Sequence, residues 1–321
     1  MAGILDVARE TGFRSPPPRK VSTPILDIHT HIGRKQVDEL VEAARIYGVQ
    51  KILGICALDD GLRLRDRFPD EVLIATTLLW DHRSDPLQFA QENQELLARA
   101  AANDVRVAKL WFGPRIYPRY EGLHLDAPLL DPVFEAIAEH RLNALVHIAD
   151  PDLWFASKYT DVATYGTKAD QYPQLEARLA QYPSLRFLAA HMGGHPEDLD
   201  HLGHLLDRYP NLSLDTSATR WMVRELGRQP EAVRAFFTKH ADRLLFGTDQ
   251  VVLDEPEPER YTVRYWIHQM FWETDLICDL PIDDPDVAGT PMLRGVNLPA
   301  EVLRKIYWEN MARWLGLAVT P

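Results

Sequence analysis

Residues 25–31 of this chain are Ile-Leu-Asp-Ile-His-Thr-His, an apolar strand-like run that ends in two histidines. Side chains of a strand alternate between its two faces, so Asp27, His29 and His31 point the same way. In a barrel that face is the interior, and two imidazoles two residues apart at the C-terminal end of a strand can both reach one metal ion. The motif by itself is equally compatible with two histidines that end a strand by chance.

Three later apolar runs also end in potential ligands. Residues 144–146 lead to His147, residues 188–190 lead to His191, and residues 244–248 lead to Asp249. Each of these polar groups would cost free energy if it were buried without a partner. One shared metal ion satisfies them together, so the sequence predicts a metal site built from several strand ends.

Strand-like and helix-like segments alternate along the chain, which is the pattern of repeated βαβ units. The expected strands are Ile25–His29, Lys51–Cys56, Val72–Leu79, Val105–Trp111, Asn143–Ile148, Leu185–His191, Leu212–Thr216 and Arg243–Gly247. The expected helices between them include Val37–Tyr47, Pro86–Ala102, Pro132–His140, Pro173–Gln181, Pro196–Arg208 and Pro230–His240. Eight units predict an α/β fold of the (β/α)8 TIM-barrel type. A doubly wound open sheet is the rival, but no Gly-rich phosphate loop follows an early strand.

The predicted domain organisation is simple. Residues 1–23 form an N-terminal arm, and residues 24–321 form a single barrel domain. Residues 250–297 are an insertion after strand eight, rich in Trp, Tyr, Asp and Pro, which serves as a lid, a subunit contact or both. An amphipathic C-terminal helix spans residues 299–315.

Composition limits the classes of function. Hydrophobic residues make up 46% of the 321 residues, enough for a full core, and the formal charge is −12. Without a block of Lys and Arg the chain is not expected to bind nucleic acid. Its two cysteines exclude a disulfide framework. No apolar run is long enough for a membrane span or a signal-peptide core, so we expect a cytoplasmic protein without a membrane partner.

The set of strand ends resembles the amidohydrolase superfamily, in particular the branch that holds metal-dependent hydrolases and non-oxidative decarboxylases. The resemblance covers residues 24–316 and includes the phrases AHMGGH and LLFGTD. It implies that the metal ligands are His29, His31, His147 and Asp249. It further implies that His191 polarises the substrate or shuttles a proton, and that Asp249 accepts a proton from metal-bound water.

Lys109, near the end of the fourth strand, has two interpretations. In some members of the superfamily a lysine at this place is carbamylated and bridges two metals, and His147 and His191 would then both bind the second ion. The alternative is a plain lysine that meets a substrate carboxylate or a neighbouring acid. The branch favours one divalent ion over two, with zinc expected and manganese or iron as alternatives.

Loops beyond strands four, five and seven face the mouth of a barrel, where the substrate binds. They carry a group of aromatic and basic residues that would suit an acidic or ring-bearing small molecule. These residues are Trp111, Arg115, Trp154, Lys158, Tyr159 and Arg220. Ordinary surface packing explains any one of them as well.

The expected function is therefore a metal-dependent hydrolase that attacks an amide, ester or lactone carbonyl of a small molecule. The alternative is a metal-dependent decarboxylase of a small acid, which would use the same ligands. A barrel that binds a ligand without catalysis is a third interpretation. Trp266, Phe271 and Trp272 of the insertion indicate contacts in a homo-oligomer or a cover over the pocket.

Overall fold

The computed structural model describes residues 3–33, 35–119, 123–257 and 259–319. Met1 and Ala2, with which the expected arm begins, lie outside the described residues. The chain divides into two compact units. Unit 1 contains residues 1–54, 65–73 and 216–321, and unit 2 contains residues 55–64 and 74–215. The division passes through three elements, β2 (Val49–Cys56), α3 (Leu58–Arg67) and β3 (Val72–Thr77).

Unit 2 is built on parallel strands. Its strands are β4 (Val107–Trp111), β5 (Asn143–His147), β6 (Phe187–Ala189) and β7 (Leu212–Asp215), which neighbour one another in chain order. In the register, Trp111 pairs with His147, Val146 with Ala189, and Ala189 with Leu214. Because parallel strands end at one edge of a sheet, this register brings the residues that follow β5 and β6 to the same edge.

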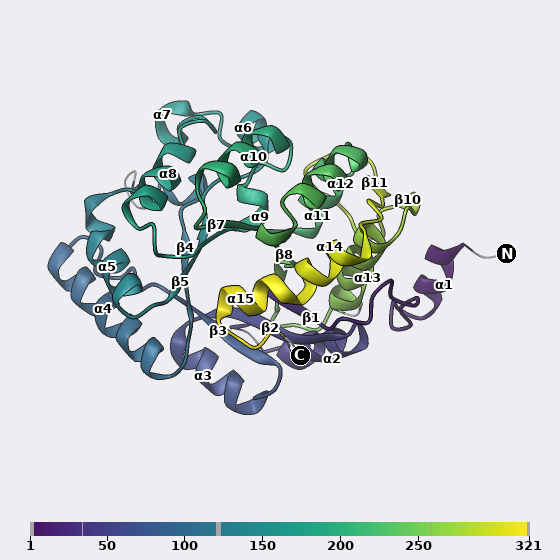
Figure 1. The fold of residues 1–321 in the computed structure, drawn as a ribbon, viewed down its shortest axis with the longest axis horizontal. Helices are drawn as coiled ribbons and strands as arrows, with labels where there is room; N and C mark the ends of the chain where they lie inside the picture. Colours follow the sequence, from purple (N-terminus) through teal and green to yellow (C-terminus); the bar gives the residue numbers. More distant parts are fainter. Residues whose placement is uncertain (1–2, 34, 120–122, 258, 320–321) are drawn as a thin grey trace. The chain divides into compact units, whose positions relative to one another are not determined.

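Helices connect the strands of unit 2 and cover them. They are α4 (Pro86–Ala102), α5 (Asp131–Glu139), α6 (Asp152–Ser157), α7 (Val162–Tyr165), α8 (Tyr172–Gln181), α9 (Ala190–Gly193) and α10 (Leu199–Arg208). Figure 1 shows α4 and α5 side by side along β4 and β5. The bounds expected for α4 are confirmed: Pro86 occupies its first turn, and Asp85 accepts hydrogen bonds from the backbone N–H groups of Leu87 and Gln88 at 3.1 and 3.2 Å.

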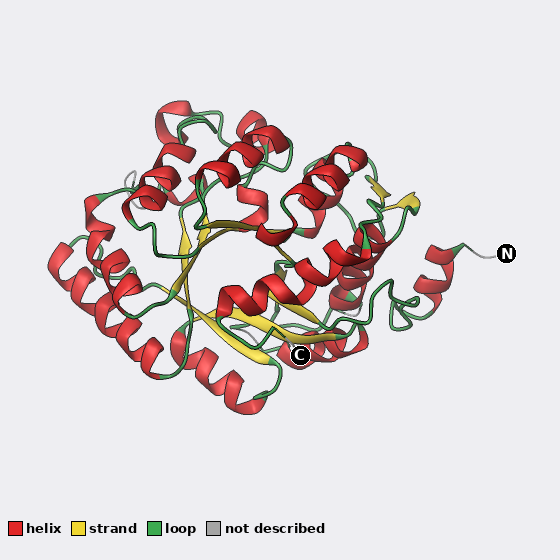
Figure 2. Cartoon of the chain, in the orientation of Figure 1, coloured by secondary structure: helices red, strands yellow, loops and turns green. Residues whose placement is uncertain are grey.

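Unit 1 contains both ends of the chain. Its strands are β1 (Ile25–His31), β8 (Leu244–Leu245), β9 (Gln250–Val251) and the antiparallel pair β10 (Ile277–Asp279) and β11 (Met292–Arg294). Its helices are α1 (Ile4–Glu10), α2 (Val37–Ile46), α11 (Thr219–Trp221), α12 (Pro230–Lys239), α13 (Arg260–Glu273), α14 (Ala300–Arg304) and α15 (Asn310–Leu315). Helix α13 packs against α2 (Figure 2), and its residues are buried along almost its whole length.

Most expected elements differ from the structure by one to three residues at an end, and the differences that matter most concern the sixth strand, the eighth strand and the C-terminal helix. The sequence predicts the sixth strand at Leu185–His191, but the strand ends at Ala189, because His191 and Met192 have φ of +57° and +53°, which no strand accommodates. The eighth strand is two residues long. In the expected C-terminal helix, α14 and α15 are joined by a π-helical turn, Lys305–Glu309. The segment 250–297 contains β9, α13, β10 and β11, and its role as a lid or a subunit contact stays a prediction.

Across the residues that the structure describes, we find no helix with both the length and the apolar character needed to cross a membrane.

Candidate metal centre and active site

Three of the expected ligands meet in unit 1. His29 and His31 extend from β1, and Asp249 follows β8. The Nε2 atoms of His29 and His31 lie 3.5 and 3.1 Å from the same oxygen, Oδ1 of Asp249. In a tetrahedral site with bonds of ~2.0–2.1 Å, neighbouring donor atoms are about 3.3 Å apart. Two imidazole nitrogens and a carboxylate oxygen at this spacing therefore fit a divalent metal such as zinc.

The surroundings of His29 hold its ring for this role. Its Nδ1 lies 3.1 Å from the hydroxyl of Ser217, which leaves Nε2 directed at Asp249. A hydrogen bond to the second ring nitrogen is the usual way in which proteins orient a metal-binding histidine. The backbone N–H of Asp249 in turn donates to the carbonyl of His29 at 2.8 Å, so ligand-bearing segments are tied together directly.

Asp27 lies on the same face of β1 as His29 and His31. Its carboxylate accepts hydrogen bonds from other protein groups and does not join the candidate metal ligands. Its Oδ1 accepts from the backbone N–H groups of Thr248 and His29 at 3.0 and 3.2 Å, and its Oδ2 accepts from the hydroxyls of Thr248 and Tyr265 at 2.5 and 3.1 Å. Burial raises the pKa of Asp27 to about 7, against the lowering effect of these hydrogen bonds. The structure therefore shows that the Asp27 carboxylate satisfies two buried backbone amides and two hydroxyls.

The other two expected histidines meet in unit 2. The rings of His147 and His191 are 4.7 Å apart and nearly perpendicular, at 77°. Nε2 of His147 lies 2.9 Å from Oδ1 of Asp150, and the Tyr159 hydroxyl donates to Oδ2 of that carboxylate at 2.6 Å. His147 thus belongs to a His–Asp–Tyr chain in which Asp150 and Tyr159 are buried. The single centre that joins His147 to the donors of unit 1 stays a prediction.

His191 stands in a turn with unusual backbone geometry. Residues 191–194 all have positive φ, from +53° to +70°. The carboxylate of Asp215 accepts a hydrogen bond from the backbone N–H of His191 at 2.8 Å and so supports this turn. Strained backbone at non-glycine residues concentrates at functional positions, and the catalytic role of His191 stays a prediction.

Lys109 is buried in β4, where it pairs in register with Leu145 and with Thr77. Carbamylation of its amine, and the second metal that would accompany it, stay predictions.

The expected substrate-binding residues belong to different units. In unit 2, Nζ of Lys158 lies 3.5 Å from the centre of the Trp154 ring and the guanidinium of Arg115 lies 5.2 Å from it. Tyr159 packs edge-on against the same indole, and Trp111 packs edge-on against His147. These five residues line one region of unit 2, whereas Arg220 lies in α11 of unit 1.

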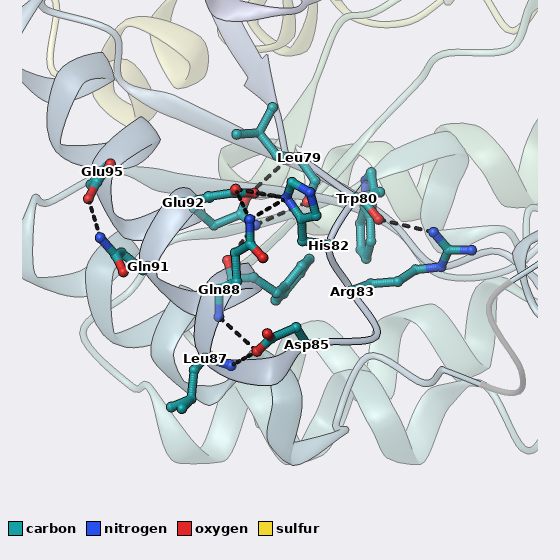
Figure 3. Close-up of polar contacts among 12 residues, drawn as sticks. Leu79, Trp80, His82, Arg83, Asp85, Leu87, Gln88, Gln91, Glu92 and Glu95 are labelled. Carbon is teal, nitrogen blue, oxygen red and sulfur yellow. Dashed lines mark hydrogen bonds and ion pairs between the residues drawn. The ribbon is translucent and has the colours of Figure 1, made fainter.

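His82, which follows β3, is engaged elsewhere. Its Nδ1 lies 2.8 and 2.9 Å from the carboxylate oxygens of Glu92, and Gln88 contacts both residues (Figure 3). His82 is exposed in the loop before α4, Glu92 on α4 is half-buried, and the hydrogen bond with Glu92 raises the pKa of His82. A surface ion pair accounts for this histidine.

A further group of donors in unit 2 is Asp152, His195 and Glu197. The amine of Lys168 lies 2.7 Å from Asp152 and 3.2 Å from Glu197. A side-chain cation therefore already pairs with both carboxylates of this group.

The sequence did not reveal the residues that orient the ligands. Ser217, Thr248 and Tyr265 contact His29 or Asp27 only through the tertiary fold. Asp150 carried a weak signal, because it lies three residues beyond His147 on the loop after β5.

The family model described as amidohydrolase matches residues 83–317 of the chain. The chain therefore belongs to the amidohydrolase family and is an enzyme of that branch. No protein of curated function matches it by sequence.

Solved structures share the fold at low sequence identity. An uncharacterised TIM-barrel protein from Bordetella bronchiseptica is 16% identical with a TM-score of 0.56, over 91% of this chain and 98% of that one. A dihydroorotase from Campylobacter jejuni is 14% identical with a TM-score of 0.55, over 93% and 85%. A 5-carboxyvanillate decarboxylase from Novosphingobium aromaticivorans, solved with manganese and 4-hydroxy-3-methoxy-5-nitrobenzoic acid, is 15% identical with a TM-score of 0.54, over 92% and 97%. These likenesses establish an α/β fold of the TIM-barrel class.

Proposed function

We propose that this enzyme is a metal-dependent hydrolase that acts on an amide, ester or lactone carbonyl of a small molecule. The observation that carries the proposal is the convergence of His29, His31 and Asp249 at the spacing of metal ligands, with both imidazoles directed at one carboxylate oxygen. Enzymes of the amidohydrolase family generally use a divalent metal, and we propose zinc, with manganese or iron as alternatives.

Each residue has a defined task in this proposal. His29, His31 and Asp249 hold one metal ion, with His147 as the fourth ligand expected from the order of strand ends. When bound, such an ion supplies a Lewis acid that makes water nucleophilic near neutral pH. Asp249 is part-exposed, so its carboxylate can also accept the proton that the attacking water loses. His191 donates a hydrogen bond to the substrate oxygen on which negative charge develops.

Decarboxylation of a small acid is the second candidate. It is favoured by the indole of Trp154, which has a lysine and an arginine against it in unit 2. Such a surface suits the ring and the carboxylate of an aromatic acid. The 5-carboxyvanillate decarboxylase to which this chain is similar has the same fold.

The first experiment measures metal content. Elemental analysis of the wild type, of a His29→Ala/His31→Ala variant and of a His82→Ala control should give about one ion per chain in the wild type and in the control. The double variant should lose it. About two ions per chain would place Lys109 in the metal site. Absence of metal from the wild type after reconstitution would refute the proposal.

The reaction is then tested on two panels. Hydrolysis of esters, lactones and amides that depends on Asp249 supports the hydrolase, with Asp249→Asn expected to lower kcat by ~100-fold or more. Release of carbon dioxide from hydroxybenzoic acids, without hydrolysis on the first panel, would instead establish the decarboxylase.

A further inference from the structure

Helix α13 reaches the segment that carries Asp249 through two separate sets of hydrogen bonds. The α13 residues that make these hydrogen bonds are all buried. In the sequence, this segment was notable only for its aromatic and polar composition. The two sets converge on Thr248, the residue that immediately precedes Asp249.

The first set runs through Tyr265. Its hydroxyl donates to Oδ2 of Asp27 at 3.1 Å, and the same oxygen accepts from the hydroxyl of Thr248 at 2.5 Å. The other oxygen of Asp27 accepts from the backbone N–H of Thr248. Tyr265 therefore fixes the carboxylate that holds Thr248 on both its side chain and its backbone.

The second set runs through His268. The indole N–H of Trp272 donates to Nδ1 of His268 at 3.3 Å, so Nδ1 is the unprotonated nitrogen. Nε2 then carries the proton and donates to the hydroxyl of Thr219 at 3.1 Å. That hydroxyl in turn donates to the backbone carbonyl of Thr248 at 3.4 Å. Every link has one donor and one acceptor, which gives the chain of bonds a single direction.

The conformation of Asp249 explains why such support is needed. Asp249 has φ of +55°, a region that costs a non-glycine residue roughly 1–2 kcal/mol. A residue persists there only where its neighbours impose the conformation. The N–H, hydroxyl and carbonyl of Thr248 are all bound, and the N–H of Asp249 donates to the carbonyl of His29, so both polar atoms of the peptide that joins Thr248 to Asp249 are held.

We propose that α13 is a positioning element for the metal centre, in which Tyr265 and His268 hold the Thr248–Asp249 peptide so that the Asp249 carboxylate faces His29 and His31. This inference rests on the proposed metal-dependent function. It assigns Tyr265, His268 and Thr219 as positioning residues, because none of them lies among the ligands.

The test compares Tyr265→Phe and Thr219→Val with matched controls. Tyr307→Phe also removes a buried tyrosine hydroxyl that donates to a carboxylate, Glu273, at 3.0 Å. Thr262→Val removes a buried threonine hydroxyl on α13 that donates to the carbonyl of Gly12. Zinc affinity is measured by competition with a chromophoric chelator, Tm by calorimetry, and ligand geometry by the visible absorption of the cobalt-substituted protein.

We expect Tyr265→Phe and Thr219→Val to weaken zinc binding by about 10- to 100-fold and to change the cobalt spectrum. The controls should keep the wild-type zinc affinity within about twofold and the wild-type cobalt spectrum. This should hold even where their Tm falls by as much as the Tm of the test variants. Wild-type zinc affinity and a wild-type cobalt spectrum in the two test variants would overturn the inference but not the proposed function. Equal losses of zinc affinity in the controls and the test variants would do the same. Failure of the wild type to bind zinc would overturn the proposed function and the inference together.

A rescue at His268 separates positioning from packing. His268→Gln places an amide N–H near the position of Nε2, whereas His268→Leu fills the space without a donor. The glutamine variant should bind zinc at least about fivefold more tightly than the leucine variant. Equal affinities would show that only the volume of the side chain matters.

Discussion

At the scale of single residues, left-handed backbone occurs at several positions in or next to the candidate active site. His191, Met192 and Asp249 have positive φ although none of them is glycine. At two of these residues a hydrogen bond compensates the strain, from Asp215 at His191 and from the contact with His29 at Asp249. The turn after β6 also depends on Gly194, whose φ is +70°.

We predict that Gly194→Ala is strongly destabilising. A Cβ at this position would lie 2.1 Å from the carbonyl oxygen of Ala149, so backbone must move in addition to the strain of the positive φ. The expected loss is at least about 3 kcal/mol in the free energy of unfolding, measured in urea.

Gly289→Ala is the matched control for that measurement. Gly289 has φ of +80°, but nothing lies within 4 Å of the position that a Cβ would occupy, so only the strain of about 1–2 kcal/mol is expected. Equal losses in the two variants would contradict the steric argument at Gly194.

At the scale of elements, α13 combines a polar interior with almost complete burial. His268 is the clearest example, because burial, together with the charge of Arg264, lowers its pKa to about 3. The ordinary value of 6.5 applies to the unfolded chain. Stability from the neutral His268 is therefore complete above pH 6.5, and it is lost progressively as the pH falls from 6.5 towards 3.

We predict that this one histidine accounts for a loss of about 2 kcal/mol in the free energy of unfolding between about pH 7.5 and 5. The measurement is urea unfolding at both pH values, with a chelator present, for the wild type and His268→Gln. The variant should lose about 2 kcal/mol less than the wild type over this range. The same pH dependence in both proteins would show that His268 is not buried in its neutral form.

At the scale of the whole molecule, the N-terminal arm illustrates how unit 1 completes its core. Phe13 is buried and packs edge-on against Trp266 of α13, with ring centres 5.5 Å apart. The hydroxyl of Tyr47 donates to the carbonyl of Phe13 at 2.6 Å, and the amide of Gln269 donates to the carbonyl of Pro17 at 2.9 Å. The arm therefore contributes apolar side chains and hydrogen-bond acceptors to the unit.

Deletion of residues 1–18 should accordingly destabilise the protein by about 3–5 kcal/mol or more, since Phe13 alone accounts for that amount. Deletion of residues 1–7 removes side chains that, from Gly3 on, are at least partly exposed, and it should change the stability by less than about 1 kcal/mol. Thermal unfolding of both truncated proteins checks the difference. Similar Tm values for the two would contradict a structural role for Phe13.

Much of the fold was predictable because it depends on local patterns. Apolar runs of strand length, Pro86 after a capping aspartate and the repeated strand–helix alternation are visible without any tertiary information. The end of the sixth strand was not predictable, because it precedes left-handed backbone at His191 and Met192 that the surrounding contacts support. The two-residue length of the eighth strand was not predictable either.

The sequence by itself determined the donor types and their order, because ligand chemistry is a property of side chains and strand alternation directs Asp27, His29 and His31 to one side. Only the tertiary structure decided that Asp27 binds backbone amides, that Ser217 orients His29, and that His147 is paired with Asp150, which also accepts from Tyr159. These partners come from distant segments or from loops. A hydrogen bond requires its donor and acceptor atoms to lie about 3 Å apart, and residue types alone do not predict that distance.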